Sequence, residues 1–310
     1  MKSKKPNFFI VGAPRCGTTA MYEYLKAHPD IFMPEHPKEP HHFGSDLQGI
    51  RFLRFRDDAK YLALFDAAKD EKCLGEASTA YLVSKRAAYE IGEFNPSAKV
   101  IIMLRSPIDM IYSIYNRNLY TSNEDLQTFE EALAAEQDRR AGKRIPKITH
   151  TLQGLFYTEF GRFTEQIQRY FDVFGREQVH IIIYDDFKSD TITAYRETLN
   201  FLEVDSAFES EFRVVNANKT IKHKTIQQLL IKTNLTPIKI KESKTFHTIR
   251  TALPKGTIDF GIKLFNNLYT QEEQRTPMKQ ETEQKLKQQF KNEIDTLSQL
   301  INHNLTNWYK

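Results

Sequence analysis

The stretch from Gly12 to Thr19 constrains this chain more than any other part of it. It reads GAPRCGTT, follows the apolar run Phe8–Val11 and leads into the helical pattern Thr18–Ala27. A tight strand-to-helix turn of this kind aims backbone N–H groups and the positive end of a helix dipole at one point. The sequence therefore predicts an anion-binding loop, with Arg15 as the cation inside it.

One residue separates this loop from the loops of nucleoside triphosphatases. The spacing matches GxxxxGK[ST], but Thr18 stands where those loops carry lysine. Without that lysine, metal-assisted phosphoryl transfer lacks a main charge stabiliser, so a different phosphorylated ligand is favoured. We predict that Arg15, Cys16, Gly17, Thr18 and Thr19 hold this ligand, with Cys16 as a small buried filler rather than a nucleophile.

A second phosphate site is predicted where the apolar run Val100–Leu104 ends. Arg105 comes directly after that run, and Ser106 and Pro107 mark the start of a helix as its N-cap and first helical residue. Ser113 lies two helical turns beyond Ser106, roughly 10 Å along the same face. Because the ends of neighbouring parallel strands form one edge of a sheet, Arg105 and Ser113 are expected to clamp an anion near the first loop.

Strand-like runs alternate with helical patterns, which predicts a single α/β domain of the P-loop type with a central, mainly parallel sheet flanked by helices. The predicted strands are Phe8–Val11, Cys73–Glu76, Val100–Leu104 and Val179–Tyr184. The clearest helical patterns are Thr18–Ala27, Lys85–Phe94, Pro107–Tyr120, Thr128–Ala141, Leu155–Phe174, Ile192–Leu202 and Glu281–Asn302. Residues 1–310 form one predicted domain, with lids or acceptor-binding insertions at about 121–150 and 206–275.

Charge and cysteine usage exclude several classes of protein. A net charge of +4 is too even for a general nucleic-acid binder. The first apolar run breaks at Gly12, so it is too short for a signal sequence or a membrane span. The two cysteines, Cys16 and Cys73, lie outside any CxxC pattern, which argues against a disulfide scaffold and structural zinc. We expect a cytoplasmic protein without a nucleic-acid partner, a membrane span or a metal ion.

Together these motifs resemble those of the sulfotransferases that use 3′-phosphoadenylyl sulfate (PAPS). Pro14–Thr19 is similar to their 5′-phosphosulfate loop, and Arg105 with Ser113 is similar to their 3′-phosphate motif. The likeness continues through Lys38–Phe43, Gly75–Tyr81, Gly154–Tyr157 and Val179–Phe187, and it resumes near Arg275–Trp308. The resemblance implies PAPS as donor, PAP as product, no metal, and a carbohydrate or other small molecule as the acceptor of sulfate at a hydroxyl or amine.

The resemblance also suggests the base that takes the acceptor proton. Glu76 ends a predicted strand, and in the carbohydrate-modifying branch the matching glutamate is the base. His41 or His42 is the rival, since histidine titrates near neutrality and serves as base in the steroid- and phenol-type branch. The heparan-type branch usually carries lysine where this chain has Arg15 and Ala77, which leaves the acceptor class open.

Two other functions remain open from the sequence. The run Ile181–Asp186 reads as a strand that ends in an acid able to hold Mg²⁺, so a P-loop nucleotide kinase or nucleoside triphosphatase is the alternative enzyme. The missing loop lysine and the Arg105–Ser113 pair argue against it, because ATP has no 3′-phosphate. A binding module without activity would be expected to have a damaged site, whereas the loop and the clamp are intact. Lys219, Lys222 and Lys224 are predicted contacts for the adenine or the acceptor.

Overall fold

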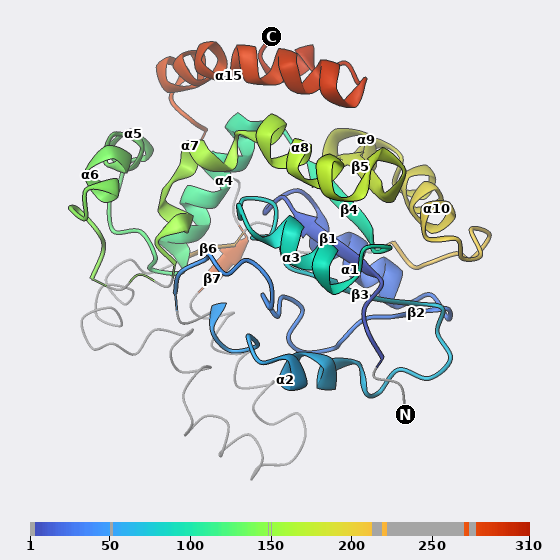
Figure 1. Cartoon of the computed structure of the whole chain (residues 1–310). Helices are drawn as coiled ribbons and strands as arrows, with labels where there is room; N and C mark the ends of the chain where they lie inside the picture. The colour runs from blue at the N-terminus through green and yellow to red at the C-terminus, as the bar shows by residue number, and fades with distance from the viewer. Residues whose placement is uncertain are drawn as a thin grey trace.

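A five-stranded parallel sheet forms the centre of the protein, in the strand order β2-β3-β1-β4-β5 (Figure 1). The computed structural model describes residues 4–49, 52–147, 149, 151–212, 219–221, 270–272 and 277–310. The strands of the sheet are β1 (Phe8–Gly12), β2 (Ile31–Phe32), β3 (Cys73–Ala77), β4 (Lys99–Leu104) and β5 (Val179–Ile183). Two further strands, β6 (Lys219–Ile221) and β7 (Thr270–Glu272), form a separate antiparallel pair.

The position of β1 decides where a ligand binds. All residues of β1 are buried, as expected for a strand that is covered on both faces. It pairs with β3 on one side and with β4 on the other. The chain therefore leaves β1 toward one edge of the sheet and later returns past it to the other. In open α/β sheets, a crevice forms at the carboxyl ends of the strands at this kind of reversal.

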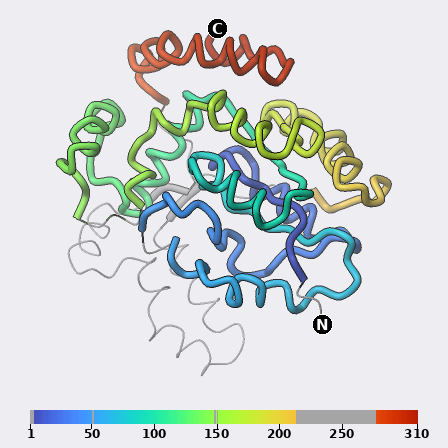
Figure 2. The backbone as a smooth tube through the Cα atoms, viewed as in Figure 1, coloured from blue at the N-terminus to red at the C-terminus, as the bar shows by residue number. Residues whose placement is uncertain are grey.

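Helices cover both faces of the sheet (Figure 1). The described α-helices are α1 (Thr18–Lys26), α2 (Asp58–Leu62), α3 (Ala87–Phe94), α4 (Pro107–Tyr120), α5 (Phe129–Ala134), α6 (Glu136–Arg140), α7 (Tyr157–Phe160), α8 (Phe163–Phe174), α9 (Tyr184–Ser189), α10 (Thr191–Leu202) and α15 (Gln280–Ile301). Helices α1 and α10 meet through the rings of Tyr24 and Tyr195, 6.4 Å apart, whereas α3 packs against α8. Helix α15 packs outside α8 and α4, as the red tube in Figure 2 shows.

The predicted α/β class is confirmed, and the differences concern short or interrupted elements. The predicted helix Thr128–Ala141 consists of α5 and α6, and β2 and α2 are too short to give a periodic pattern. The predicted helix Leu155–Phe174 is interrupted at Gly161. A Cβ atom at Gly161 would lie 2.5 Å from the ring of Phe290, so glycine allows α15 to approach the interruption closely.

The predicted insertion at 121–150 is anchored by a buried ion pair. Arg139 in α6 binds both carboxylate oxygens of Glu124, at 2.6 and 2.8 Å, and the Tyr157 hydroxyl donates to the same carboxylate at 2.8 Å. A two-bond guanidinium–carboxylate pair fixes orientation as well as distance. The predicted insertion at 206–275 lies largely outside the described residues, as do Lys222 and Lys224, while Lys219 begins β6.

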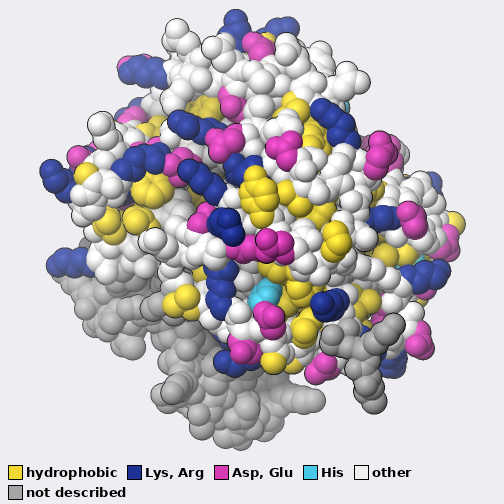
Figure 3. Space-filling model, viewed as in Figure 1, with side chains coloured by type: hydrophobic (Ala, Val, Ile, Leu, Met, Phe, Trp, Pro, Cys, Tyr) yellow, Lys and Arg dark blue, Asp and Glu magenta, His cyan; other side chains and the backbone are white. Residues whose placement is uncertain are grey.

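The visible surface carries charges of both signs. Figure 3 shows Lys and Arg side chains interspersed with Asp and Glu over this face, rather than gathered into one field of a single sign. This distribution agrees with the small net charge of +4. Within the described part of the chain, no helix combines the length and the apolar character that a membrane crossing requires.

Candidate active site

The predicted anion-binding loop lies between β1 and α1, at the carboxyl edge of the sheet. Gly17 precedes α1 with a φ of 86°, in the left-handed region, and no side chain caps this helix. A Cβ atom at Gly17 would also lie 3.1 Å from the ring of Tyr184. Glycine therefore allows the turn, and the N-terminus of α1 is left to bind an anion through its backbone N–H groups.

A hydrogen bond joins the two predicted phosphate sites. Arg15 Nε, in the loop, donates to Ser113 Oγ on α4 at 2.8 Å. The Ser113 side chain is buried, so its hydroxyl is fixed in this position. Because the hydroxyl oxygen accepts from Arg15, its proton is available for a further acceptor such as a phosphate oxygen. Two residues that are far apart in the sequence thus form one polar site.

Arg105 lies beside this pair at the end of β4. Its Nη2 donates to Asp109 Oδ2 at 3.1 Å, and its Cζ lies 5.2 Å from the centroid of the Tyr184 ring. Its Nε is buried and has no hydrogen-bond partner within the described ranges. A buried guanidinium N–H without an acceptor is costly, and a phosphate oxygen supplies the acceptor. The residues present therefore fit a ligand with two phosphates.

Lys38 brings a further cation to the loop. Its Nζ donates to Thr19 Oγ1 at 3.0 Å and lies 3.8 Å from Glu39 Oε1. The sequence did not place Lys38 at the loop, because a loop segment without periodicity does not show where its side chains point. The structure places the ammonium group of Lys38 beside Thr19, next to Thr18, which stands where nucleoside triphosphatases carry their lysine.

Glu76 lies at the end of β3, yet it is fully buried, with 0% of its surface exposed. Its Oε1 accepts from the hydroxyls of Tyr81 at 2.7 Å and Tyr61 at 3.1 Å, and its Oε2 accepts from Ser78 Oγ at 2.6 Å. Burial raises the pKa of this carboxyl to about 7, against the opposing effect of the three hydroxyl donors. That pKa suits proton exchange near neutrality, but a base must also reach the acceptor. The predicted role of Glu76 as base stays a prediction.

The two histidines, His41 and His42, follow Lys38 and Glu39 in the chain, and both are buried. His41 is buried, with Nε2 at 3.4 Å from Glu39 Oε2. His42 stacks on the ring of Tyr61 at 4.0 Å and bonds the carbonyl of Phe55 through Nδ1. Burial lowers the pKa of His42, so its imidazole is neutral at physiological pH. Their predicted part in proton transfer also stays a prediction.

The surroundings of Cys16 fit its predicted structural role. Cys16 is fully buried, and burial raises the pKa of its thiol to about 12, which agrees with a filler and not with a thiolate nucleophile.

Strand β5 ends at Ile183, and the two acids that follow it contact other parts of the protein. Asp185 accepts a hydrogen bond from Trp308 Nε1 at 3.0 Å, and Asp186 lies 3.3 Å from His303. Both acids thus contact the C-terminal segment, and the described residues include no cluster of three or more metal-binding side chains.

Comparisons with known proteins point to one family. A family model described as the sulfotransferase domain matches residues 5–295. Carbohydrate sulfotransferase 15 of Homo sapiens is 25% identical over 261 residues, which cover 66% of this chain and 45% of that protein. Human bifunctional heparan sulfate N-deacetylase/N-sulfotransferase 3 is 28% identical over 205 residues, which cover 64% of this chain and 22% of that protein. The chain therefore spans less than half the length of these curated relatives.

A solved structure agrees with the sequence matches over the whole fold. The crystal structure of a sulfotransferase from Alicyclobacillus acidocaldarius is similar with a TM-score of 0.72 and 27% identity, covering 99% of this chain and 100% of that one. The nucleoside triphosphatase alternative is not favoured by these comparisons. The family match covers nearly all of the sequence, and the chain belongs to the sulfotransferase domain family.

Proposed function

We propose that this protein transfers the sulfuryl group of PAPS to a hydroxyl or amine of a carbohydrate or another small molecule. The hydrogen bond from Arg15 to Ser113 carries the proposal, because it joins the 5′-phosphate loop to the 3′-phosphate motif. Arg105, with a buried Nε that lacks an acceptor among the described residues, stands beside them. PAPS and PAP have phosphates at both positions, whereas ATP and GTP have no 3′-phosphate.

The chain supplies positive charge where the reaction needs it. When bound, PAPS supplies an activated sulfuryl group on its 5′-phosphate. Arg15, Lys38 and the N-terminus of α1 together surround the loop, so they would stabilise the negative charge that the leaving phosphate gains. Because sulfate carries less charge than a terminal phosphate, these groups suffice, and we predict transfer without a divalent metal.

Two carboxylates compete for the role of base, and the geometry favours Glu39. Glu39 is 21% exposed and lies 3.8 Å from Lys38, which itself contacts Thr19 of the loop. Glu76, the base predicted from the sequence, is 0% exposed and holds three hydroxyl donors. A group that takes a proton from an acceptor must come within hydrogen-bond reach of it, so we propose Glu39 as the base.

The proposed acceptor class and location have separate support. The names of the curated relatives, which include carbohydrate and heparan sulfate sulfotransferases, support a carbohydrate acceptor. Both cysteines, Cys16 and Cys73, are free and buried, which agrees with the cytoplasmic location predicted from the sequence. Screening simple amino sugars, alcohols and phenols for release of PAP from PAPS tests the acceptor class.

Calorimetric titration with PAP tests the proposal directly. We expect PAP to bind equally with and without Mg²⁺, and Arg105→Ala to weaken it roughly a hundredfold, since loss of a charge-assisted contact of this kind typically costs a few kcal/mol. Arg86→Ala is the matched control, because Arg86 is 57% exposed and pairs only loosely with Glu90, at 3.8 Å. Preferential binding of Mg-ATP or Mg-GTP, unchanged in Arg105→Ala, would contradict the proposal.

A further inference from the structure

We propose that Glu76 is a positioning residue that holds the Lys38–Phe43 segment beside the phosphate loop through the hydroxyls of Ser78 and Tyr81. This inference rests on the proposed function, in which Lys38 stabilises charge at the loop and Glu39 is the base. It differs from the role that the sequence predicted for Glu76. The evidence is a set of hydrogen bonds between the turn after β3 and the Lys38–Phe43 segment.

The first connection runs through Ser78. Its hydroxyl donates to Glu76 Oε2 at 2.6 Å and accepts from the backbone N–H of His41 at 3.1 Å. Glu76, Ser78 and His41 are all buried. Removal of the carboxylate would therefore leave the Ser78 hydroxyl without its acceptor in a site that water does not reach, which is costly.

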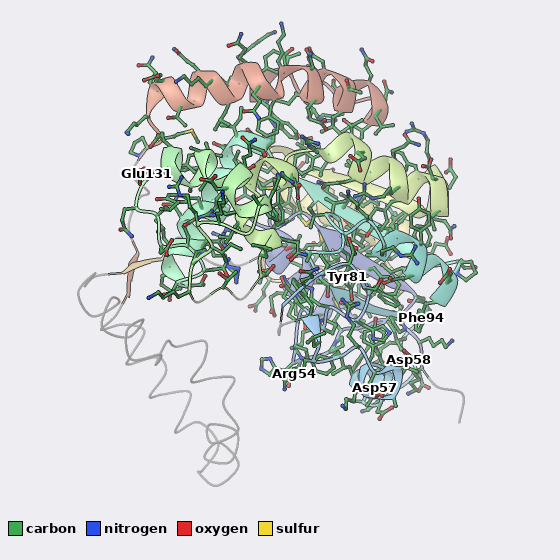
Figure 4. All side chains as sticks on the ribbon, turned by 60° about the vertical axis from the view of Figure 1, so that its left-hand side comes forward. Arg54, Asp57, Asp58, Tyr81, Phe94 and Glu131 are labelled. Atoms are coloured by element: carbon green, nitrogen blue, oxygen red, sulfur yellow. The ribbon has the colours of Figure 1, made fainter. Side chains whose placement is uncertain are left out.

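The second connection runs through Tyr81. Its hydroxyl donates to Glu76 Oε1 at 2.7 Å and accepts from the backbone N–H of Phe43 at 3.2 Å. Tyr81, labelled in Figure 4, lies among the side chains near the sheet. The same turn also binds the segment at Glu39, whose Oε1 accepts from Thr79 Oγ1 at 3.3 Å. Alternate residues of the segment, 39, 41 and 43, are thus held by three hydroxyls of one turn.

Only an acceptor at position 76 sets both hydroxyls in the required direction. A hydroxyl has one proton. When it donates that proton in a hydrogen bond to a carboxylate, the lone pairs of its oxygen are left to accept from other donors. An ionised carboxylate is acceptor-only, so it accepts hydrogen bonds from the hydroxyls of Ser78 and Tyr81 at the same time. The hydroxyl oxygens of Ser78 and Tyr81 then accept hydrogen bonds from the backbone N–H groups of His41 and Phe43, respectively. A neutral amide at position 76 has one acceptor and one donor, so it cannot orient both hydroxyls in this way.

The held segment carries the groups that face the loop. Lys38 lies three residues before His41, and its Nζ reaches Thr19 Oγ1 at 3.0 Å. Glu39 Oε2 lies 3.4 Å from the ring of His41. A segment tethered at 39, 41 and 43 has little freedom to move either side chain. Glu76 therefore acts on transfer through the placement of Lys38 and Glu39, without touching the donor or the acceptor.

Backbone amide exchange, followed by NMR without ligand, tests the two connections one by one. We expect Ser78→Ala to speed exchange at His41 alone and Tyr81→Phe at Phe43 alone, each by roughly tenfold, the effect of one lost hydrogen bond. Glu76→Gln is expected to speed exchange at both amides. Equal acceleration at amides of the β4–β5 ladder, such as Ile102, which does not pair with β3, would show a general loss of stability and would overturn the inference, as would native exchange rates at His41 and Phe43.

Two variants serve as matched controls. Tyr61→Phe removes a donor to Glu76 that makes no bond to the segment and keeps the stacking on His42, so the two amides should exchange at native rates. Glu90→Gln alters a second carboxylate that binds the next amides, of Gly44 and Ser45. It should affect those amides and leave His41 and Phe43 protected.

Turnover separates a positioning role from a base. In the acceptor screen, Glu76→Gln should lower kcat roughly tenfold, well short of the 10²- to 10⁴-fold loss of a general base, and should change PAP affinity less than about twofold. A loss of kcat equal to that of Glu39→Gln would identify Glu76 as the base and overturn the inference. If native protein fails to bind PAP, the proposed function fails, while the exchange pattern still decides whether Glu76 holds the segment.

Discussion

Buried polar groups on the two sides of the carboxyl edge of the sheet differ in their hydrogen-bond partners. On the side of β1 and β4, Arg105 has a buried Nε without an acceptor among the described residues, and α1 begins without a side-chain cap. On the side of β3, the Glu76 carboxylate accepts three hydroxyls, two of which also hold backbone N–H groups. On the first side a ligand can supply the missing acceptor, whereas the Glu76 carboxylate on the second side has its hydrogen-bond donors inside the protein.

This difference indicates which buried charges serve binding and which serve structure. A buried polar group that lacks a partner costs free energy that a ligand can recover, so beside an uncapped helix N-terminus it favours a binding site. A buried carboxylate with all its partners inside the protein orients those partners instead. Glu76 is the last but one residue of β3 and Arg105 directly follows β4, and both were predicted site residues. Their hydrogen bonds show that they have different tasks.

The largest expected effect is at Glu39, the proposed base. Glu39→Gln keeps the shape of the side chain but removes the base, so we expect the initial rate of PAP release with the best acceptor of the screen to fall roughly 10²- to 10⁴-fold. PAP affinity, measured by calorimetry, should stay near native, because Glu39 is not among the proposed phosphate contacts. A rate close to native would move the base elsewhere and contradict the assignment.

The next effect concerns the cost of burying Glu76. Its pKa rises from an ordinary 4.5 to about 7 in the folded protein, so between these values the folded state binds the proton more readily than the unfolded state. The contribution of Glu76 to the free energy of unfolding should therefore fall by about 3 kcal/mol from pH 4.5 to pH 7 and stay level above. Urea unfolding at pH 5 and pH 7.5 measures this change.

Glu76→Gln is the comparison for that measurement. Glutamine does not titrate, so the variant should lose this part of the pH dependence, while all other carboxylates keep theirs. If the free energy of unfolding depends on pH equally in the native protein and the variant, Glu76 titrates near its ordinary pKa. Its carboxylate would then not be held in a network that excludes water.

The smallest expected effect tests the link between the two phosphate sites. Arg15→Lys keeps the positive charge but loses the Nε donor to Ser113, so we expect PAP affinity to fall roughly tenfold. Ser113→Ala and the double variant complete a double-mutant cycle by calorimetry. If the losses of PAP binding free energy in the two single variants add in the double variant, Arg15 and Ser113 act as separate contacts. Their hydrogen bond would then not couple the two predicted phosphate sites.

Much of the fold was predictable because its signals are local. The apolar runs predicted four of the five strands of the sheet to within a residue or so, and Ser106 and Pro107 marked the start of α4 correctly. The interruption at Gly161 was not predictable, because it involves a long-range contact with Phe290 in α15. Two-residue β2 and five-residue α2 are too short for periodicity to reveal them.

The site divides in the same way. The sequence predicted the phosphate loop and the Arg105–Ser113 motif, and it indicated the family that the sulfotransferase domain match shows, because these depend on residue types at fixed spacing along the chain. The contacts of Arg15 with Ser113 and of Lys38 with Thr19, and the burial of Glu76 under three hydroxyls, became known only from the tertiary structure. Exposure and hydrogen-bond partners arise from segments far apart in the sequence, so a strand-end glutamate looks the same in the sequence whether it meets substrate or holds a neighbouring loop.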